Sequence, residues 1–413
     1  MDDILSLDNI KKYSWHLKVM GAYVQQPTPA IVGLDLQTII ASNDAAALYP
    51  TSIIYSNIGF DTIRHRVYDT HIIRNILRLI EGTFKDKENN PAIIDSALNG
   101  FTTAIGTITK EYFKNKSVQN KKEAYEFTIT YYPMLLKKIL TYHGKLDDIF
   151  NPKDDQTYVL LKSCLYPILE AITWLNPNNN GYNQLLVNYV FFNEDFIKSP
   201  QDIYILEEIN STKSRFKKYS FADGISIFEN YIVNPYGVLF DKHKNNLAYD
   251  VKLLMDALAN RRIVKNQMLV LYSITNHWAK LSQESLSFFD GLDNSNDYKL
   301  TSEQANQILT EIRDDQDRKS RIDTLMEIEW YHKNTGITAL KFGKLRSVQF
   351  KIIQEGIKVA ANSAYGIFGL ITWPFASPLI GNAITNAGKI YGIKLFQAVT
   401  VDVLGKIENT RDD

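Results

Sequence analysis

Residues 44–54 read Asp-Ala-Ala-Ala-Leu-Tyr-Pro-Thr-Ser-Ile-Ile, and residues 358–366 read Lys-Val-Ala-Ala-Asn-Ser-Ala-Tyr-Gly. The first stretch follows residues 31–40, Ile-Val-Gly-Leu-Asp-Leu-Gln-Thr-Ile-Ile, whose β-branched side chains predict a strand that ends just before Asp44. A carboxylate at the end of a strand is well placed to bind a metal ion. The alternative is a solvated turn or helix-cap aspartate, which is a common role for this residue type.

The second stretch makes sense as one face of a helix. Lys358, Asn362 and Tyr365 are separated by steps of four and three residues, which return to the same face at about 100° per residue. That face presents a cation, an amide and an aromatic ring. An aromatic residue at helical spacing can equally be part of a core, so Tyr365 has a purely structural alternative.

These groups suit phosphoryl transfer. That reaction is catalysed mainly by positioning and by two divalent cations that neutralise charge on the attacking and leaving oxygens. A site of this kind needs rigidly held carboxylates and accessible backbone amides. The small side chains of residues 45–47 leave such amides open.

The two stretches resemble motifs A and B of the phage-type family B DNA polymerases. Neighbouring segments strengthen the resemblance because several of them match in the same order. They are Gly21-Ala22-Tyr23-Val24, Pro27-Thr28-Pro29, Asn57-Ile58-Gly59 and Asp61-Thr62-Ile63. The chain departs from the family at Ala45 and Ala47, where the family has an aromatic residue and a serine.

A second pair of cations resembles the first fingers helix of that family. In residues 256–268, Arg261 precedes Lys265 by four residues, so both lie on one helix face. An isolated pair of this kind is usually a solvated surface. Here it follows residues 234–240, Asn-Pro-Tyr-Gly-Val-Leu-Phe, which resemble the hairpin that leads into the fingers of phage enzymes.

The resemblance implies a role for each matching residue. Asp44 and Ala45 bind Mg²⁺, and Tyr49 stacks under the incoming sugar and excludes ribonucleotides. Tyr365 and Gly366 lie against the DNA at the nascent base pair. The residues that bind the nucleotide are Ala46, Ala47, Leu48, Tyr49, Arg261, Lys265, Lys358 and Asn362.

The predicted fold class is α+β and predominantly helical. It comprises an incomplete polymerase palm of short strands and helices, a fingers subdomain made of a long antiparallel helix pair, and a helical insertion. Helical spacing in the insertion covers residues 72–84, 93–114, 124–143 and 158–175, and its aromatic residues suit either a core or a partner surface. The predicted segments are a strand-rich palm segment at 1–65, the insertion at 66–232, the hairpin at 233–250, the fingers at 251–357, and motif B with a palm helix at 358–413.

Composition excludes several classes of protein. The chain has 413 residues, 45% of them hydrophobic, and a net charge of zero, so its affinity for DNA cannot rest on a wholly basic surface. Its seven histidines form no zinc motif, and its single cysteine, Cys164, lies in an apolar run that predicts burial. The absence of a long apolar run or a leader predicts a soluble protein with no membrane partner, in the cytoplasm, or the host cytoplasm if a phage encodes it.

Two function hypotheses follow. In the first, the chain is the palm and fingers subunit of a split DNA-directed DNA polymerase that uses two Mg²⁺ ions, dNTPs and a DNA primer-template. The family's third motif, a Tyr-Gly-Asp-Thr-Asp-Ser turn with the second metal-binding carboxylate, has no counterpart here, nor do the thumb and the exonuclease. Complementary polypeptides are therefore expected to supply them. In the second hypothesis, the chain is a non-catalytic nucleic-acid-binding or structural protein derived from a polymerase fragment.

Overall fold

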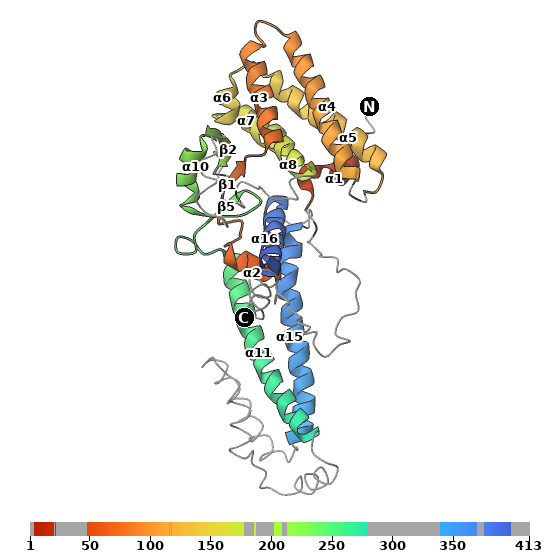
Figure 1. Ribbon diagram of the computed structural model, residues 1–413, viewed down its shortest axis with the longest axis vertical. Coiled ribbons are helices and arrows are strands. Elements are labelled where there is room, and N and C mark those ends of the chain that lie inside the picture. Colours follow the sequence, from red (N-terminus) through yellow and green to blue (C-terminus); the bar gives the residue numbers. More distant parts are fainter. Residues whose placement is uncertain are drawn as a thin grey trace, which may run out of the picture. The chain divides into compact units, whose positions relative to one another are not determined.

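The computed structural model shows a predominantly helical protein with one small antiparallel sheet (Figure 1). The structure describes residues 4–19, 21, 48–114, 116, 118–176, 186, 202–208, 213–279, 339–369 and 376–397. The α+β class predicted from the sequence is confirmed at this level.

The chain divides into two compact units. The first comprises residues 1–251 and 365–413, and the second comprises residues 252–364. One boundary thus lies next to the predicted start of the fingers at residue 251. The other lies within a continuous helix, α15 (Ala339–Gly369), a few residues beyond the predicted limit at 357.

The sheet belongs to the first unit and has the strand order β3-β2-β1-β5-β4, with every neighbouring pair antiparallel. Its central strand is β1, which directly follows the turn after the motif A-like stretch. The strands are β1 (Ile63–Tyr68), β2 (Ile203–Glu207), β3 (Arg215–Tyr219), β4 (Tyr231–Val233) and β5 (Val238–Asp241).

Each face of the sheet packs on a different core, because successive strand residues point to opposite faces. Tyr68, Tyr204 and Leu206 join the large core formed by the helices of residues 71–175. Val67 and Ile205 join a smaller cluster on the other face, with Phe221 and Phe228 of α10 (Phe221–Phe228).

The long helices of the large core form where the sequence predicts them, whereas the short helix at residues 146–150 was not predicted. Thr70, Asp154 and Ser220 cap α3, α7 and α10 by accepting a hydrogen bond from a backbone amide in the first turn. Cys164 is buried and unpaired, as predicted. The helices are α3 (His71–Asp86), α4 (Ala92–Lys114), α5 (Lys121–Leu140), α6 (Leu146–Phe150), α7 (Asp155–Val159), the π-helical turn η2 (Leu160–Leu165) and α8 (Tyr166–Leu175).

Two sequence predictions need correction. Where the sequence predicts a strand-rich approach to motif A, the described residues before it form the helix α1 (Leu7–Tyr13), which Ser6 caps, and then a 3₁₀ turn, η1 (Trp15–Leu17). The insertion at 66–232 is not purely helical either, since it contributes β2 and β3. β2 pairs with β1 and β3 pairs with β2, and this addition to the sheet stabilises two short segments that would be marginal as an isolated hairpin. The predicted strand at 31–40 lies outside the described residues.

One continuous helical stretch, residues 155–175, is long and apolar enough to cross a membrane by length and composition. Within the fold, however, 67% of its most apolar window is buried. Burial of this extent is typical of the core helix of a soluble protein.

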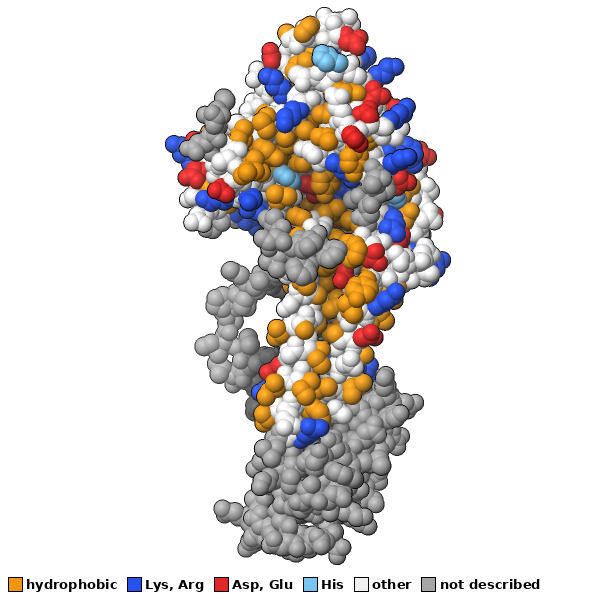
Figure 2. Space-filling model, turned by 180° about the vertical axis from the view of Figure 1, so that it is seen from behind, with side chains coloured by type: hydrophobic (Ala, Val, Ile, Leu, Met, Phe, Trp, Pro, Cys, Tyr) orange, Lys and Arg blue, Asp and Glu red, His pale blue; other side chains and the backbone are white. Residues whose placement is uncertain are grey.

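The second unit contains most of two long helices, α11 (Tyr249–Ala279) and α15, which lie side by side (Figure 1). Nε of Arg261 on α11 donates to Oε1 of Gln354 on α15 at 3.3 Å. Several apolar side chains of α15 are exposed, among them Val348, Ile352 and Val359. Elsewhere on the face shown in Figure 2, basic and acidic side chains are interspersed, in keeping with the zero net charge.

Stability is expected to fall in acid because of His65, which is 8% exposed on β1 with its ring 4.8 Å from that of Tyr231. Burial lowers the pKa of His65 to about 4, although Glu207 and Asp241 oppose the shift. Since the folded pKa lies below the unfolded value of about 6.5, stability is full above pH 6.5 and is lost as the pH falls towards 4.

His65→Phe keeps an aromatic ring against Tyr231 and removes the titration. When the pH is lowered from 7.5 to 5, the unfolding free energy of this variant should therefore fall by about 2 kcal/mol less than that of the wild type. Urea denaturation at the two pH values measures the difference. Identical losses in the two proteins would show that His65 is not the acid-sensitive group.

Candidate functional site

Two tyrosines from the motif A-like and motif B-like stretches meet in the first unit. Tyr49 lies in the first turn of α2 (Leu48–Tyr55), and Tyr365 lies near the end of α15. Their rings stack with centroids 4.5 Å apart and an interplanar angle of 16°. Both side chains are only partly buried, so the stacked pair remains accessible to a ligand.

A third helix, α16 (Pro378–Gln397), holds this pair in place. The hydroxyl of Tyr365 is 2.9 Å from Oγ1 of Thr385, which is fully buried. A Cβ atom at Gly388 would lie 3.3 Å from Cε1 of Tyr49, so the small residue allows the ring to rest on the helix. No role was predicted from the sequence for the side chains of residues 381–388.

The ring of Tyr49, in the motif A-like stretch, is in a partly desolvated setting. Burial raises the pKa of Tyr49, and the neighbouring Tyr365 contributes to the increase. The hydroxyl of Tyr49 is therefore neutral at physiological pH. A neutral, flat ring at this place can stack on a sugar or a base without repelling a phosphate.

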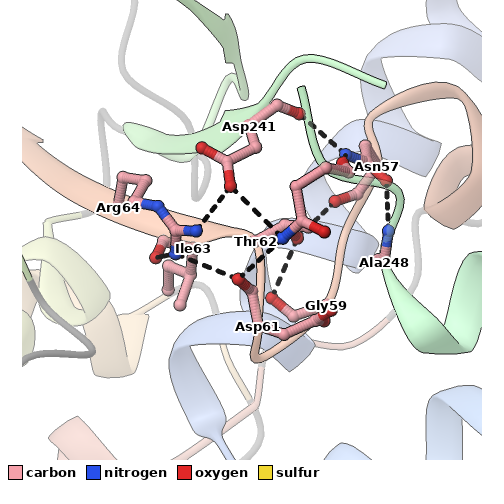
Figure 3. Close-up of polar contacts among 9 residues, drawn as sticks. Asn57, Gly59, Asp61, Thr62, Ile63, Arg64, Asp241 and Ala248 are labelled. Carbon is pink, nitrogen blue, oxygen red and sulfur yellow. Dashed lines mark hydrogen bonds and ion pairs between the residues drawn. The ribbon is translucent and has the colours of Figure 1, made fainter. Parts of the chain in front are cut away.

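The side chain of Asn57 fixes the turn after α2 by hydrogen bonds (Figure 3). The backbone of Asn57 is left-handed, with φ of 51°. Its Nδ2 donates to the carbonyl oxygens of Asp241 at 2.8 Å and Asn246 at 2.7 Å. Its Oδ1 accepts from the amide of Ala248 at 2.9 Å. The fully buried amide thus uses both donors and its acceptor to fix the turn to residues 241–248.

Other contacts reinforce the same turn (Figure 3). The hydroxyl of Thr62 donates to the carbonyl of Asn57 at 2.7 Å, and Arg64 forms an ion pair with Asp241 at 2.5 Å. The ladder between β1 and β5 shifts register between Ile63 and His65, next to Arg64. Residues 57–59 and 61–63 contribute to the family resemblance, but no role was predicted for their side chains.

The predicted triphosphate ligands lie in the second unit. Lys265, Lys358 and Asn362 are exposed, and Arg261 is partly exposed. The partner of Arg261, Gln354, lies one helical turn before Lys358 on α15, so it belongs to the same helix face. Arg261 therefore approaches the face of α15 that carries the predicted lysine.

The structure leaves part of the predicted site undescribed. Asp44, Ala45, Ala46 and Ala47 lie outside the described residues, so their predicted roles in binding Mg²⁺ and the nucleotide stay predictions. Within the described ranges, no group of three or more His, Cys, Asp or Glu side chains is arranged to hold a metal ion. Leu48 begins α2 next to Tyr49, and Gly366 is exposed beside Tyr365.

A buried ion pair that was not predicted from the sequence links elements next to the site. Nε of Arg66 on β1 donates to Oε1 of Glu170 on α8 at 2.8 Å, and the two side chains are 1% and 5% exposed. Tyr68 donates to the same oxygen at 2.7 Å, and Tyr236 donates to Oε2 at 2.9 Å. The sequence does contain one signal for this pair. Glu170 is the only acidic residue in the apolar run of residues 166–175, and a buried charge requires a partner.

The loop that carries Tyr236 also contacts α16. In the loop of residues 234–237, Asn234 accepts a hydrogen bond from the amide of Tyr236 and donates to the carbonyl of Ala383 at 3.1 Å. Gly237 has φ of 93°, and a Cβ atom there would lie 2.6 Å from the carbonyl oxygen of Val67. Asn at the first position of the turn, Pro at the second and Gly at the fourth are the residues that a type I turn favours.

Comparisons with known proteins add no assignment, since a scan against protein-family models and searches of curated proteins and solved structures returned no match.

The close approach at Gly59 generates a stability prediction. A Cβ atom at Gly59 would lie 2.7 Å from Cβ of Ala248, closer than real Cβ contacts. Gly59→Ala should therefore lower the unfolding free energy by about 1 to 3 kcal/mol.

Adding Ala248→Gly should restore part of the loss, because it removes one of the two atoms that would clash, the other being Oδ1 of Asp61 at 2.8 Å. A double-mutant cycle measured by chemical denaturation checks this coupling. If the two substitutions act additively, the turn and residue 248 are not in contact.

Proposed function

We propose that the chain forms the palm and fingers portion of a DNA-directed DNA polymerase that resembles the phage-type family B enzymes. It adds dNTPs to a DNA primer by phosphoryl transfer assisted by two Mg²⁺ ions. Asp44 provides one metal-binding carboxylate. The second carboxylate comes from outside these 413 residues, on a complementary polypeptide that carries the third motif and the thumb, with or without an exonuclease.

The observation that carries the proposal is the stack of Tyr49 on Tyr365. The resemblance to motif A assigns Tyr49 to the sugar of the incoming nucleotide, and the resemblance to motif B assigns Tyr365 to the adjacent base pair. These roles require the two rings to be neighbours, although they are far apart in the sequence. The resemblance rests on the sequence alone, so the contact between Tyr49 and Tyr365 is independent support for it.

In the proposed reaction, each group of this chain has a separate task. Tyr49 packs against the sugar and leaves no room for a ribose 2′-hydroxyl. Arg261, Lys265 and Lys358 neutralise the triphosphate, and the guanidinium of Arg261 can bind two phosphate oxygens at once. The Mg²⁺ ions supply charge neutralisation at the attacking and leaving oxygens.

The first test is reconstitution. The chain should extend a primer only when it is mixed with a polypeptide that carries the Tyr-Gly-Asp-Thr-Asp-Ser turn, because one carboxylate cannot hold two Mg²⁺ ions in the required geometry. In this mixture Asp44→Asn should abolish nucleotide addition while the complex still assembles, since the substitution removes charge but little volume.

Gel-based primer extension measures the activity, and size-exclusion chromatography measures assembly. Full activity of Asp44→Asn would show that the metal ligand has been misplaced. Binding of DNA without incorporation in any mixture would favour the non-catalytic alternative.

The second test compares neighbouring arginines on α11. Arg261→Ala should weaken dNTP binding roughly tenfold to a hundredfold, the effect of losing one charge-assisted contact of about 1.5 to 3 kcal/mol. The loss should be similar for all four dNTPs because the contact is to phosphate.

Arg262→Ala is the matched control, since residue 262 lies about 100° further around the helix and is exposed. Steady-state incorporation kinetics on the reconstituted complex distinguish the two variants. Equal effects at the two positions would mean that the register assigned to α11 is wrong.

A further inference from the structure

One connection from the helical layer of residues 71–175 towards the candidate site runs through a buried carboxylate. Glu170 on α8 accepts hydrogen bonds from β1 through Arg66 and Tyr68, and from the 234–237 loop through Tyr236. All four side chains are almost fully buried. The guanidinium carbon of Arg66 lies 4.7 Å from the ring centroid of Tyr68 and 4.3 Å from that of Tyr236, so both rings also contact the cation.

The two tyrosines differ in what lies beyond them. The hydroxyl of Tyr236 accepts a hydrogen bond from Nδ2 of Asn382 on α16 at 3.4 Å, and the loop's Asn234 donates to the carbonyl of Ala383 on the same helix. Within the described part of the chain, the hydroxyl of Tyr68 hydrogen-bonds to Glu170 and makes no such bond to α16. Tyr236, but not Tyr68, therefore links Glu170 to α16.

The helix α16 is the element on which the stacked tyrosines rest. Thr385 and Gly388, which contact Tyr365 and Tyr49, follow Asn382 by about one and two turns. A shift of α16 at its Asn382 turn would therefore be transmitted to both rings. Residues 381–388 are all buried, so the helix has little freedom to adjust by moving towards solvent.

We propose that Glu170 and Tyr236 are positioning residues, through which the helical layer of residues 71–175 fixes α16 and thereby the geometry of the Tyr49–Tyr365 pair. The inserted helices are then a structural support of the nucleotide site. The importance of this geometry for nucleotide selection rests on the proposed function, whereas the physical coupling itself does not.

Matched variants test the coupling. Tyr236→Phe and Tyr68→Phe each remove one buried hydroxyl that donates to Glu170 and keep the ring against Arg66. Asn234→Ser is a second variant on the pathway, because serine can still cap the turn but cannot reach the carbonyl of Ala383. Circular dichroism and thermal unfolding of each full-length variant establish that it is folded.

The direct measurement is the ¹⁹F NMR resonance of 3-fluorotyrosine incorporated at position 365 of the full chain. The resonance should move or broaden in Tyr236→Phe and in Asn234→Ser but stay at its wild-type position in Tyr68→Phe. A resonance unchanged in the first two variants, or moved equally in Tyr68→Phe, would overturn the proposal.

A second measurement addresses the consequence for the reaction. In the reconstituted complex, Tyr236→Phe should raise the KM for dNTPs or the acceptance of ribonucleotides by about threefold to tenfold with little change in kcat, while Tyr68→Phe should behave like the wild type. Equal kinetic changes in both variants would show that the effect is a general loss of stability, which would contradict a specific role for Tyr236. Failure of the wild-type complex to incorporate any nucleotide would count against the proposed function alone, because the NMR result does not depend on it.

Discussion

The ion pair between Arg66 and Glu170 is the constraint on which the first unit is built. Both charges are withdrawn from water, and such a pair is stable only when the remaining donors and acceptors are satisfied as well. Burial opposes the charged form of Arg66, but Glu170 and the neighbouring tyrosines raise its pKa above its usual range. Breaking a buried pair of this kind typically costs about 3 to 5 kcal/mol, because one charge is left uncompensated.

The partners of this pair come from elements that are distant in sequence. Arg66 belongs to the central strand of the sheet, Glu170 to the last helix of the large core, and Tyr236 to the loop between β4 and β5. Nη1 of Arg66 also donates to the carbonyl of Val67 at 2.9 Å and to that of Tyr236, which binds the loop to the strand. Through α16, the same arrangement reaches the stacked rings of Tyr49 and Tyr365. Groups held by packed and hydrogen-bonded elements of this kind keep the fixed geometry that a binding site for a sugar and a base requires.

Sequence reasoning succeeded where the signal was local. Helical periodicity predicted the helices between residues 71 and 175, and the spacing of Lys358, Asn362 and Tyr365 predicted that they share one helix, which α15 confirms. It failed where pairing between distant segments decides the structure. Strand β2 joins the sheet by pairing with β1, which is far away in the sequence, and β3 pairs only with β2, so neither short segment is recognisable as a strand by itself.

The supporting contacts of the site were missed for a related reason. Asn57 acts through three backbone groups of residues 241–248, and the sequence of the turn does not reveal those partners. Thr385 and Gly388 matter because α16 packs against α2, a tertiary contact that helical periodicity cannot predict. The tyrosine stack itself was not predicted: the resemblance assigned Tyr49 to the incoming sugar and Tyr365 to the nascent base pair, without a contact between the two rings.

The central claim is that one incoming nucleotide contacts both motif A-like and motif B-like stretches. Photo-crosslinking tests it most directly, with a dNTP that carries a photoreactive base bound to the complex of this chain with its complementary polypeptide and a primer-template. Mass spectrometry should find the label in the peptides that contain Tyr49 and Tyr365, and an excess of the unlabelled dNTP complementary to the template base should prevent labelling. Labelling confined to other peptides, or labelling that no unlabelled dNTP prevents, would contradict the account.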